Sequence, residues 1–176
     1  CREPTTSEVR LYSGGDQYCH SRCRCYTGGL MADRIHEIVP GLFQGSHLRG
    51  SMPEPIQAVL NVDYTNARYT TEGLKGYTHM PILDGPNPGR EWLINALTVL
   101  GQYRASQWNT YVHCQAGISR SVFVTAALLV REQGVTPKEA VKMINAKSGF
   151  ADPAPAFLLA LEDFYKEEMI ARVATP

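Results

Sequence analysis

The ten residues 112–121, VHCQAGISRS, decide how the rest of the chain is interpreted. They are preceded by a short β-branched and aromatic run at 110–112, which predicts a buried strand. They are followed by a nearly unbroken apolar run at 122–130, whose length and terminal Gly134 favour a buried helix over a strand. The sequence therefore predicts a strand, a tight loop and then a helix that begins near Arg120.

A loop between a strand and a helix N-terminus is a place where an anion binds. Successive backbone N–H groups point at one spot, and the helix dipole adds positive potential. Cys114 lies at the start of this loop. A free thiol has a pKa of about 8.5, and a helix dipole contributes at most about 2 kcal/mol to the stability of an anion. Full ionisation therefore needs further donors, which the loop amides, the Ser121 hydroxyl and the Arg120 guanidinium can supply.

Arg120 also suits a phosphate, because its planar fork matches two phosphate oxygens bidentately. The pattern His113-Cys114, five residues, then Arg120-Ser121 resembles the signature of the cysteine-dependent protein tyrosine phosphatases, and with Gly117 it is most similar to their dual-specificity branch. This resemblance implies that Cys114 is the nucleophile and that Ser121 stabilises the thiolate that departs when the phosphocysteine intermediate breaks down. The phosphate-binding residues that it implies are Gln115, Ala116, Gly117, Ile118, Ser119 and Arg120. The alternative is a buried free cysteine before a core helix.

A phosphate ester also needs a proton for its leaving oxygen, and neither a thiolate nor an arginine supplies one. Asp84 stands in a loop dense in turn formers, LDGPNPG at 83–89, directly after a strand candidate at 77–82. This stretch resembles the general-acid loop of the family, with Asp84 as the acid. The alternative is that Asp84 only forms a turn by accepting bonds from backbone N–H groups. His113 is expected to pack and hydrogen-bond behind the loop, whereas His47 has no partner at a recognisable spacing.

Hydrophobic patterning predicts strands that alternate with helices. The expected class is α/β, a mostly parallel central sheet flanked by helices on both faces, as in the protein tyrosine phosphatases. Residues 45–55 are short and Pro-rich, so a helix there should be abbreviated, and 64–76 should form a loop with one helical turn. The predicted strands are 35–39, 42–44, 58–62, 77–82 and 110–113, and the predicted helices are 90–104, 120–133, 136–147 and one that begins at 152.

Composition bounds the possible functions. The 176 residues carry 17 basic and 17 acidic side chains, so no overall positive field is available for nucleic acid. No apolar run approaches 18 residues, and no secretory signal is visible. We therefore expect no nucleic-acid partner, no membrane association, no metal, no cofactor and a monomer.

The first 32 residues differ from the remainder. They hold four of the five cysteines, Cys1, Cys19, Cys23 and Cys25, and sustain no helical or strand period. We expect a loosely ordered Cys-rich arm at 1–32, outside the resemblance, followed by a dual-specificity-phosphatase-like catalytic domain at 33–176. The cysteines of this N-terminal arm could be free thiols, members of a disulfide or zinc ligands.

The loop also indicates a substrate class. None of the four side chains at 115, 116, 118 and 119 is basic, which favours a monoester such as phosphotyrosine with phosphoserine or phosphothreonine. A catalytic thiol needs a reducing compartment, the cytoplasm or the nucleus. The rival hypotheses are a phosphoprotein-binding pseudophosphatase-like module, a phosphatase for a non-protein ester, a sulfurtransferase and an arsenate reductase.

Overall fold

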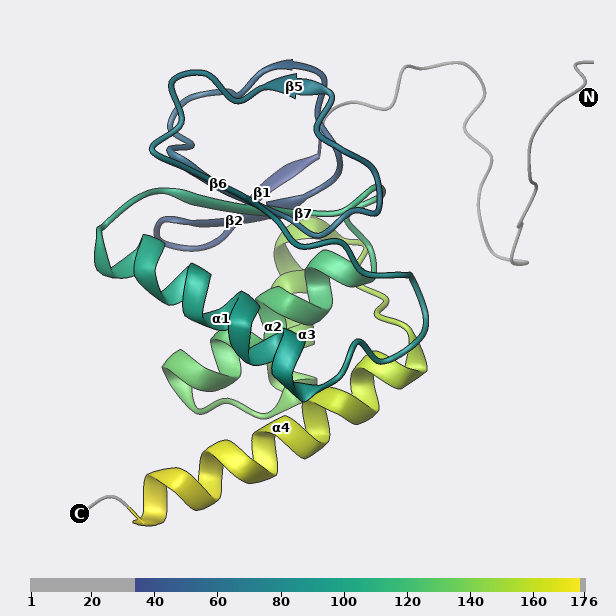
Figure 1. Cartoon of the computed structure of the whole chain (residues 1–176). Coiled ribbons are helices and arrows are strands. Elements are labelled where there is room, and N and C mark those ends of the chain that lie inside the picture. The colour runs from purple at the N-terminus through teal and green to yellow at the C-terminus, as the bar shows by residue number, and fades with distance from the viewer. Residues whose placement is uncertain (1–33, 175–176) are drawn as a thin grey trace, which may run out of the picture. The chain divides into compact units, whose positions relative to one another are not determined.

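The computed structural model of the chain describes residues 34–174 (Figure 1). The predicted arm at 1–32 lies outside these residues. The elements alternate as expected. The strands are β1 (Ile35–Val39), β2 (Leu42–Gly45), β3 (Gly50–Ser51), β4 (Ala58–Asn61), β5 (Tyr69–Thr70), β6 (Gly76–His79) and β7 (Thr110–His113). The helices are α1 (Arg90–Ala105), α2 (Arg120–Gln133), α3 (Pro137–Ser148) and α4 (Pro155–Ala174).

Five strands form the main sheet, in the order β1-β2-β7-β4-β6. β1 and β2 make an antiparallel hairpin, and every other pair in this sheet is parallel. β7 lies at the centre, with its last residue, His113, opposite Gly45 of β2 and Asn61 of β4. The predicted α/β class with a mostly parallel sheet is confirmed. The register brings the carboxyl ends of three parallel strands to one edge, which is where ligands bind in such sheets.

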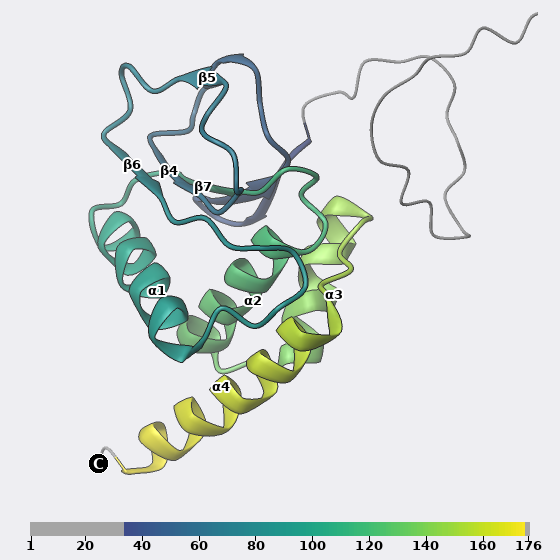
Figure 2. The ribbon, with the colours of Figure 1, turned by 45° about the vertical axis from the view of Figure 1, so that its right-hand side comes forward.

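The expectation of helices on both faces needs a correction. All four helices lie on one side of the sheet, as Figures 1 and 2 show from two directions. Side chains of alternate strand residues separate the two faces: Leu60 and Val112 pack with the helices, whereas Val59 and Tyr111 pack against loops. The segments between β2 and β4 and between β4 and β6 cover this second face. They are short and interrupted by Pro or Gly, so they bury apolar side chains without forming helices.

Two local predictions differ in detail. The single helical turn expected within 64–76 is instead β5, which pairs with β3. The last helix begins at Pro155 and not at 152. The backbone N–H of Asp152 donates to the carbonyl of Ile118, 2.9 Å away. That bond holds the chain before α4 against the loop that precedes α2. The other helix boundaries follow the sequence signals, including the Thr136–Glu139 capping box of α3 and the left-handed Gly134 that ends α2.

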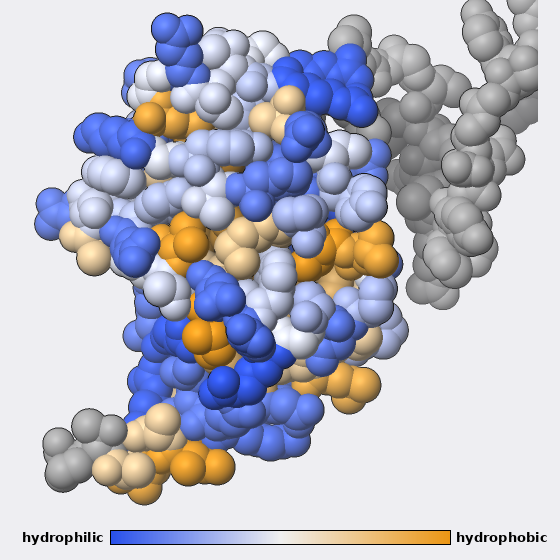
Figure 3. Space-filling view, viewed as in Figure 1, coloured by the Kyte–Doolittle hydropathy of each residue, from blue (hydrophilic) through white to orange (hydrophobic). Residues whose placement is uncertain are grey.

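The core between sheet and helices is built mainly on α2, where eleven residues in succession, 120–130, are buried. α4 covers this helix through Phe157, whose ring stacks on Phe123 with centroids 4.7 Å apart. Towards its C-terminus α4 leaves the core, and Ile170 and Val173 are exposed. The C-terminal end of α4, at the lower left of Figure 3, carries hydrophobic surface. None of the helices within 34–174 is long and apolar enough to cross a membrane.

The α2–α4 contact can be tested by truncation. Phe157→Ala leaves a cavity against Phe123, and we expect it to lower the free energy of unfolding by about 3–5 kcal/mol. Leu159→Ala, two residues along the same helix, is the control, because Leu159 is 68% exposed; its effect should stay within about 0.5 kcal/mol. Urea unfolding followed by circular dichroism measures both. Equal losses in the two variants would contradict this packing.

Candidate active site

The strand–loop–helix unit predicted from residues 112–121 is present. β7 ends at His113, and residues 114–120, named here the anion-binding loop, lead into α2. The Cys114 sulfur is almost fully buried and has two neighbours from this unit. The Gly117 backbone N–H donates to Sγ at 3.3 Å, and the Ser121 Oγ lies 3.3 Å from it. Both neighbours can stabilise negative charge on the sulfur.

Gly117 allows the anion-binding loop to sit against β2. Gly117 has a φ of +74°, and a Cβ built on it would meet the carbonyl carbon of Gly45 at 2.5 Å. Both the backbone conformation and the space therefore require glycine at this position. The loop is consequently held directly above the end of β2.

His113 braces the loop from behind, as expected. Its ring is fully buried; Nδ1 lies 3.3 Å from the Cys114 carbonyl oxygen and Nε2 lies 2.6 Å from the Tyr69 hydroxyl. Burial lowers the pKa of His113 to about 4, so the ring is neutral at pH 7. A carbonyl only accepts, so Nδ1 donates to it and Nε2 accepts from Tyr69. Burial raises the pKa of Tyr69, which keeps that phenol protonated as the donor.

Arg120 is buried at the first turn of α2, where Nη1 donates to Asp63 Oδ1 at 3.0 Å. Its Nε makes no hydrogen bond within the described residues and lies 3.9 Å from Asp84 Oδ2. Asp63 thus fixes one corner of the guanidinium. A buried donor without a partner is costly, so the Nε edge is available for an oxyanion.

Asp63 is itself held by several donors. Its Oδ2 accepts from His47 Nδ1 at 3.0 Å and from Thr65 Oγ1 at 2.8 Å. The other ring nitrogen of His47 accepts from the backbone N–H of Arg68, so a neutral His47 carries its proton on Nδ1. Burial raises the pKa of Asp63, but the bonds from His47 and Thr65 and the charge of Arg120 outweigh it and leave the pKa below its usual value. Asp63 is therefore a stable anion beneath Arg120.

Asp84 reaches the same site from the loop between β6 and α1. Its Oδ1 accepts from Ser119 Oγ at 2.6 Å, and its carboxylate is 53% exposed. The Ser119 hydroxyl in turn accepts from the backbone N–H of Ala154 at 3.2 Å. One serine thus links the anion-binding loop, the Asp84 loop and the segment before α4.

The structure brings together Cys114, Arg120, Ser121 and Asp84, the four residues predicted as catalytic. Among the predicted phosphate-binding residues, Gln115 and Ala116 are exposed, Ile118 and Ser119 are partly buried, and Gly117 and Arg120 are buried.

Sequence reasoning missed Asp63 and its partner His47. A signal for Asp63 was present, because a polar residue shortly after a buried parallel strand lies at the sheet edge where the other strands end. His47 gave no comparable signal, since its spacing from Asp63 has no regularity.

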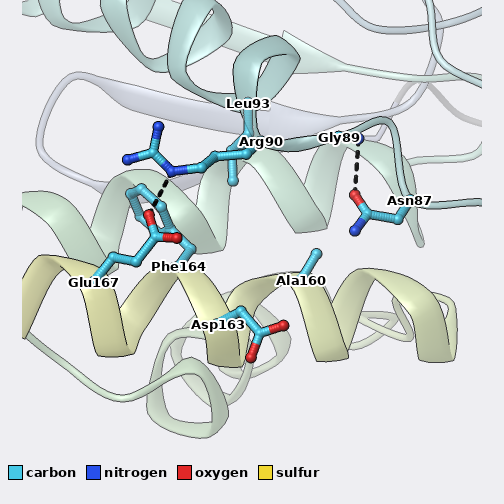
Figure 4. Close-up of a pocket in the computed structure, with 8 residues that line it drawn as sticks. All are labelled: Asn87, Gly89, Arg90, Leu93, Ala160, Asp163, Phe164 and Glu167. Atoms are coloured by element: carbon cyan, nitrogen blue, oxygen red, sulfur yellow. Dashed lines mark hydrogen bonds and ion pairs between the residues drawn. The ribbon is translucent and has the colours of Figure 1, made fainter.

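The hollow shown in Figure 4 is separate from the anion-binding loop. It has a volume of about 200 Å³ and lies between α4 and the start of α1. Its ionic groups pair locally, Arg90 with Glu167 and Asp163 with Lys166. On its α1 side, the Asn87 side chain accepts from the Gly89 N–H and closes the turn that ends the Asp84 loop. The Asn87 turn therefore helps to shape that loop, and the charged side chains that line the hollow are paired with neighbours.

The Asp63–Arg120 pair gives a pH-dependent prediction. Asp63→Asn should lower the free energy of unfolding at pH 7 by roughly 3 kcal/mol, because it leaves a buried arginine without its anion. Because folding lowers the pKa of Asp63, its stabilisation is present above about pH 4 and lost as the pH falls further. The difference in the free energy of unfolding between wild type and variant, measured by urea unfolding, should therefore become smaller below pH 4. Asp163→Asn, at an exposed carboxylate, is the control; a gap that persists at pH 2 would contradict the assignment.

Known proteins resemble this chain in both sequence and fold. The family model described as dual specificity phosphatase, catalytic domain, matches residues 45–167. The chain is 33% identical over 134 residues to dual specificity protein phosphatase 2 of Homo sapiens, covering 73% of the chain and 42% of that protein. It is 25% identical over 138 residues to dual specificity protein phosphatase 15 of Rattus norvegicus, covering 76% of the chain and 58% of that protein. The chain thus covers only 42% and 58% of the lengths of these two relatives.

Among solved structures, that of PTPMT1 has the same fold, with a TM-score of 0.67, 24% identity, and coverage of 81% of this chain and 99% of that one. PTPMT1 has also been solved in complex with PI(5)P. The family model covers more than half of the chain, and it includes the anion-binding loop, Asp63 and Asp84. The resemblance seen in the sequence is therefore confirmed: the chain belongs to the dual specificity phosphatase catalytic-domain family.

Proposed function

We propose that residues 33–176 form the catalytic domain of a phosphatase that hydrolyses phosphate monoesters of proteins through a phosphocysteine intermediate. The observation that carries this proposal is the convergence of three groups on one site: the Cys114 sulfur, the Nε edge of Arg120 and the Asp84 carboxyl group. A nucleophile, an oxyanion-binding group and a proton donor are the parts that such a reaction needs. No metal or cofactor enters the proposed reaction.

In the first step, the Cys114 thiolate attacks phosphorus. The S–P bond forms while the bond from phosphorus to the leaving oxygen breaks, and Asp84 donates its proton to that oxygen. Arg120 and the backbone N–H groups of the anion-binding loop hold the three equatorial oxygens. Asp63 supports this step, because its bond to Nη1 holds the guanidinium in place before the substrate arrives.

In the second step, water attacks the phosphocysteine. Asp84, now a carboxylate, accepts a proton from the water as the new P–O bond forms and the S–P bond breaks. The Ser121 hydroxyl, 3.3 Å from the sulfur, donates to the departing thiolate. Inorganic phosphate then leaves and the enzyme returns to its starting state.

The proposed substrates carry phosphotyrosine and phosphoserine or phosphothreonine. The anion-binding loop supports a monoester, because its side chains at 115, 116, 118 and 119 carry no charge to meet a second phosphate. Two exposed apolar side chains, Tyr64 at 68% and Leu83 at 59%, directly adjoin Asp63 and Asp84 in the chain and could contact a peptide. The need for a reduced Cys114 supports a reducing compartment, the cytoplasm or the nucleus, for the proposed activity.

Two rivals can be separated by assay. A phosphatase for a non-protein ester is the first, because PTPMT1, with the same fold, was solved with PI(5)P; comparing kcat/KM for phosphopeptides and for PI(5)P distinguishes it. A phosphoprotein-binding module without turnover is the second. It would bind a phosphopeptide but release no phosphate.

Cys114→Ser tests the nucleophile. A serine hydroxyl is almost wholly un-ionised at neutral pH, so turnover of p-nitrophenyl phosphate should be abolished while tungstate still binds the loop. Phosphate release measures turnover, and calorimetry measures tungstate binding. Turnover close to that of wild type would exclude Cys114 as the nucleophile.

Asp84→Asn tests the proton donor. We expect kcat to fall by about 10²–10⁴ for a phosphopeptide, whose leaving group needs a proton. The loss should be much smaller for p-nitrophenyl phosphate, because nitrophenolate departs without protonation. Asp163→Asn, an exposed carboxylate on α4, is the control and should leave both rates unchanged. Equal losses on the two substrates would show that Asp84 does not protonate the leaving oxygen.

A further inference from the structure

We propose that Gln44 is a positioning residue that sets both the shape of the anion-binding loop and the direction of the Ser121 hydroxyl. This inference rests on the proposed function, since it assigns a role within the same site. Gln44 is fully buried near the end of β2, beneath the loop. It belongs to neither the loop nor the Asp84 segment, and the sequence pattern of the site does not include it.

The amide of Gln44 makes two short bonds. Nε2 donates to the Gly117 carbonyl oxygen at 2.8 Å and to Ser121 Oγ at 2.8 Å. The Gly117 carbonyl can only accept, so the reversed amide would place two oxygen atoms against each other. Chemistry therefore determines the orientation, and both N–H groups of the amide are used.

The first bond orients a peptide group of the loop. In a trans peptide the C=O of one residue and the N–H of the next point in opposite directions. Because Gln44 draws the Gly117 carbonyl down towards β2, the N–H of Ile118 is turned to the opposite side, away from β2. Gly117, with its φ of +74°, is the residue that permits this orientation. Gln44 thus helps to hold one of the backbone donors on which an oxyanion-binding loop depends.

The second bond determines what Ser121 does. With Gln44 donating to its oxygen, the hydroxyl proton of Ser121 is free for another acceptor. The two acceptors in reach are the Cys114 sulfur at 3.3 Å and the Gly45 carbonyl at 3.4 Å. A thiolate is a charged acceptor, and bonds to charged groups are about twice as strong as neutral ones. Gln44 therefore biases Ser121 towards donating to sulfur whenever the sulfur is negative.

This arrangement lowers the stability of the folded protein. Gln44 is buried on the helix-covered side of the sheet, and its Oε1 has no hydrogen-bond partner within the described residues. An unsatisfied buried polar atom costs stability, and such costs are typical of functional positions. An apolar side chain of similar length would remove this cost together with both donors. Stability and activity should consequently change in opposite directions when Gln44 is replaced.

The test is Gln44→Met, with Gln44→Leu as a second variant. We expect kcat for p-nitrophenyl phosphate to fall at least about tenfold, equivalent to ~1.4 kcal/mol in the barrier, while the thermal unfolding midpoint stays level or rises. A pre-steady-state burst of nitrophenol should grow, because Ser121 acts on breakdown of the intermediate. Combining Gln44→Met with Ser121→Ala should enlarge the burst no further than Ser121→Ala does by itself.

An assay that needs no turnover distinguishes a failure of the proposed phosphatase function from a failure of the proposed role of Gln44. Tungstate protects Cys114 from alkylation by iodoacetate when it occupies the loop, and Gln44→Met should need more tungstate for the same protection. If wild type binds tungstate but releases no phosphate from any ester, the proposed function fails while the role of Gln44 in shaping the loop is still measured.

Gln57→Met is the matched control, since Gln57 precedes β4 at the opposite end of the sheet and its amide oxygen accepts from the Asn109 backbone N–H. It should lower the unfolding midpoint and leave kcat unchanged. Wild-type kcat in Gln44→Met, an equal loss of kcat in Gln57→Met, or loss of folding in both Gln44 variants would overturn the proposal.

Discussion

The position of β7 between β2 and β4 is the constraint on which the site depends. All three strands run parallel, and their register sets Gly45, His113 and Asn61 side by side. Residues just before or after these three positions therefore meet at one sheet edge, although they are far apart in the chain. Cys114 follows one strand and Asp63 follows another. The site is a consequence of strand pairing, because a slip of one residue in any of these strands would turn that strand's side chains to the opposite face.

The same edge collects polar groups that a core would normally exclude. Arg120, Ser121 and Gln44 are buried at or beneath the first turn of α2, and Asp63 is buried beside them. Most of their polar atoms are paired with one another or with the backbone, which makes their burial tolerable. The exceptions within the described residues include Arg120 Nε and Gln44 Oε1. The first is where an oxyanion is expected to bind, and the second accompanies a side chain that uses both of its donors on the loop.

The layer of helices α2, α3 and α4 supports this edge of the sheet. α2 is buried along most of its length and is covered in turn by α3 and α4. The segment before α4 returns to the loop, where the Asp152 N–H bonds the Ile118 carbonyl and the Ala154 N–H bonds Ser119. Ser119 then bonds Asp84, so the loop that carries the proposed proton donor is tied to the helical layer. An exposed aspartate in a turn-rich loop is thereby held beside the buried Arg120.

The sequence by itself determined the strand–loop–helix unit around Cys114, the α/β class and most element boundaries, because hydrophobic periodicity, the capping box of α3 and the glycine positions act over short distances. It also indicated Asp84, through the turn formers around it. Only the tertiary structure decided that loops cover the second face of the sheet, that α4 begins at Pro155, and that Asp63, His47 and Gln44 surround the loop. These features arise from strand register and from hydrogen bonds between segments more than ten residues apart, which local sequence patterns do not encode.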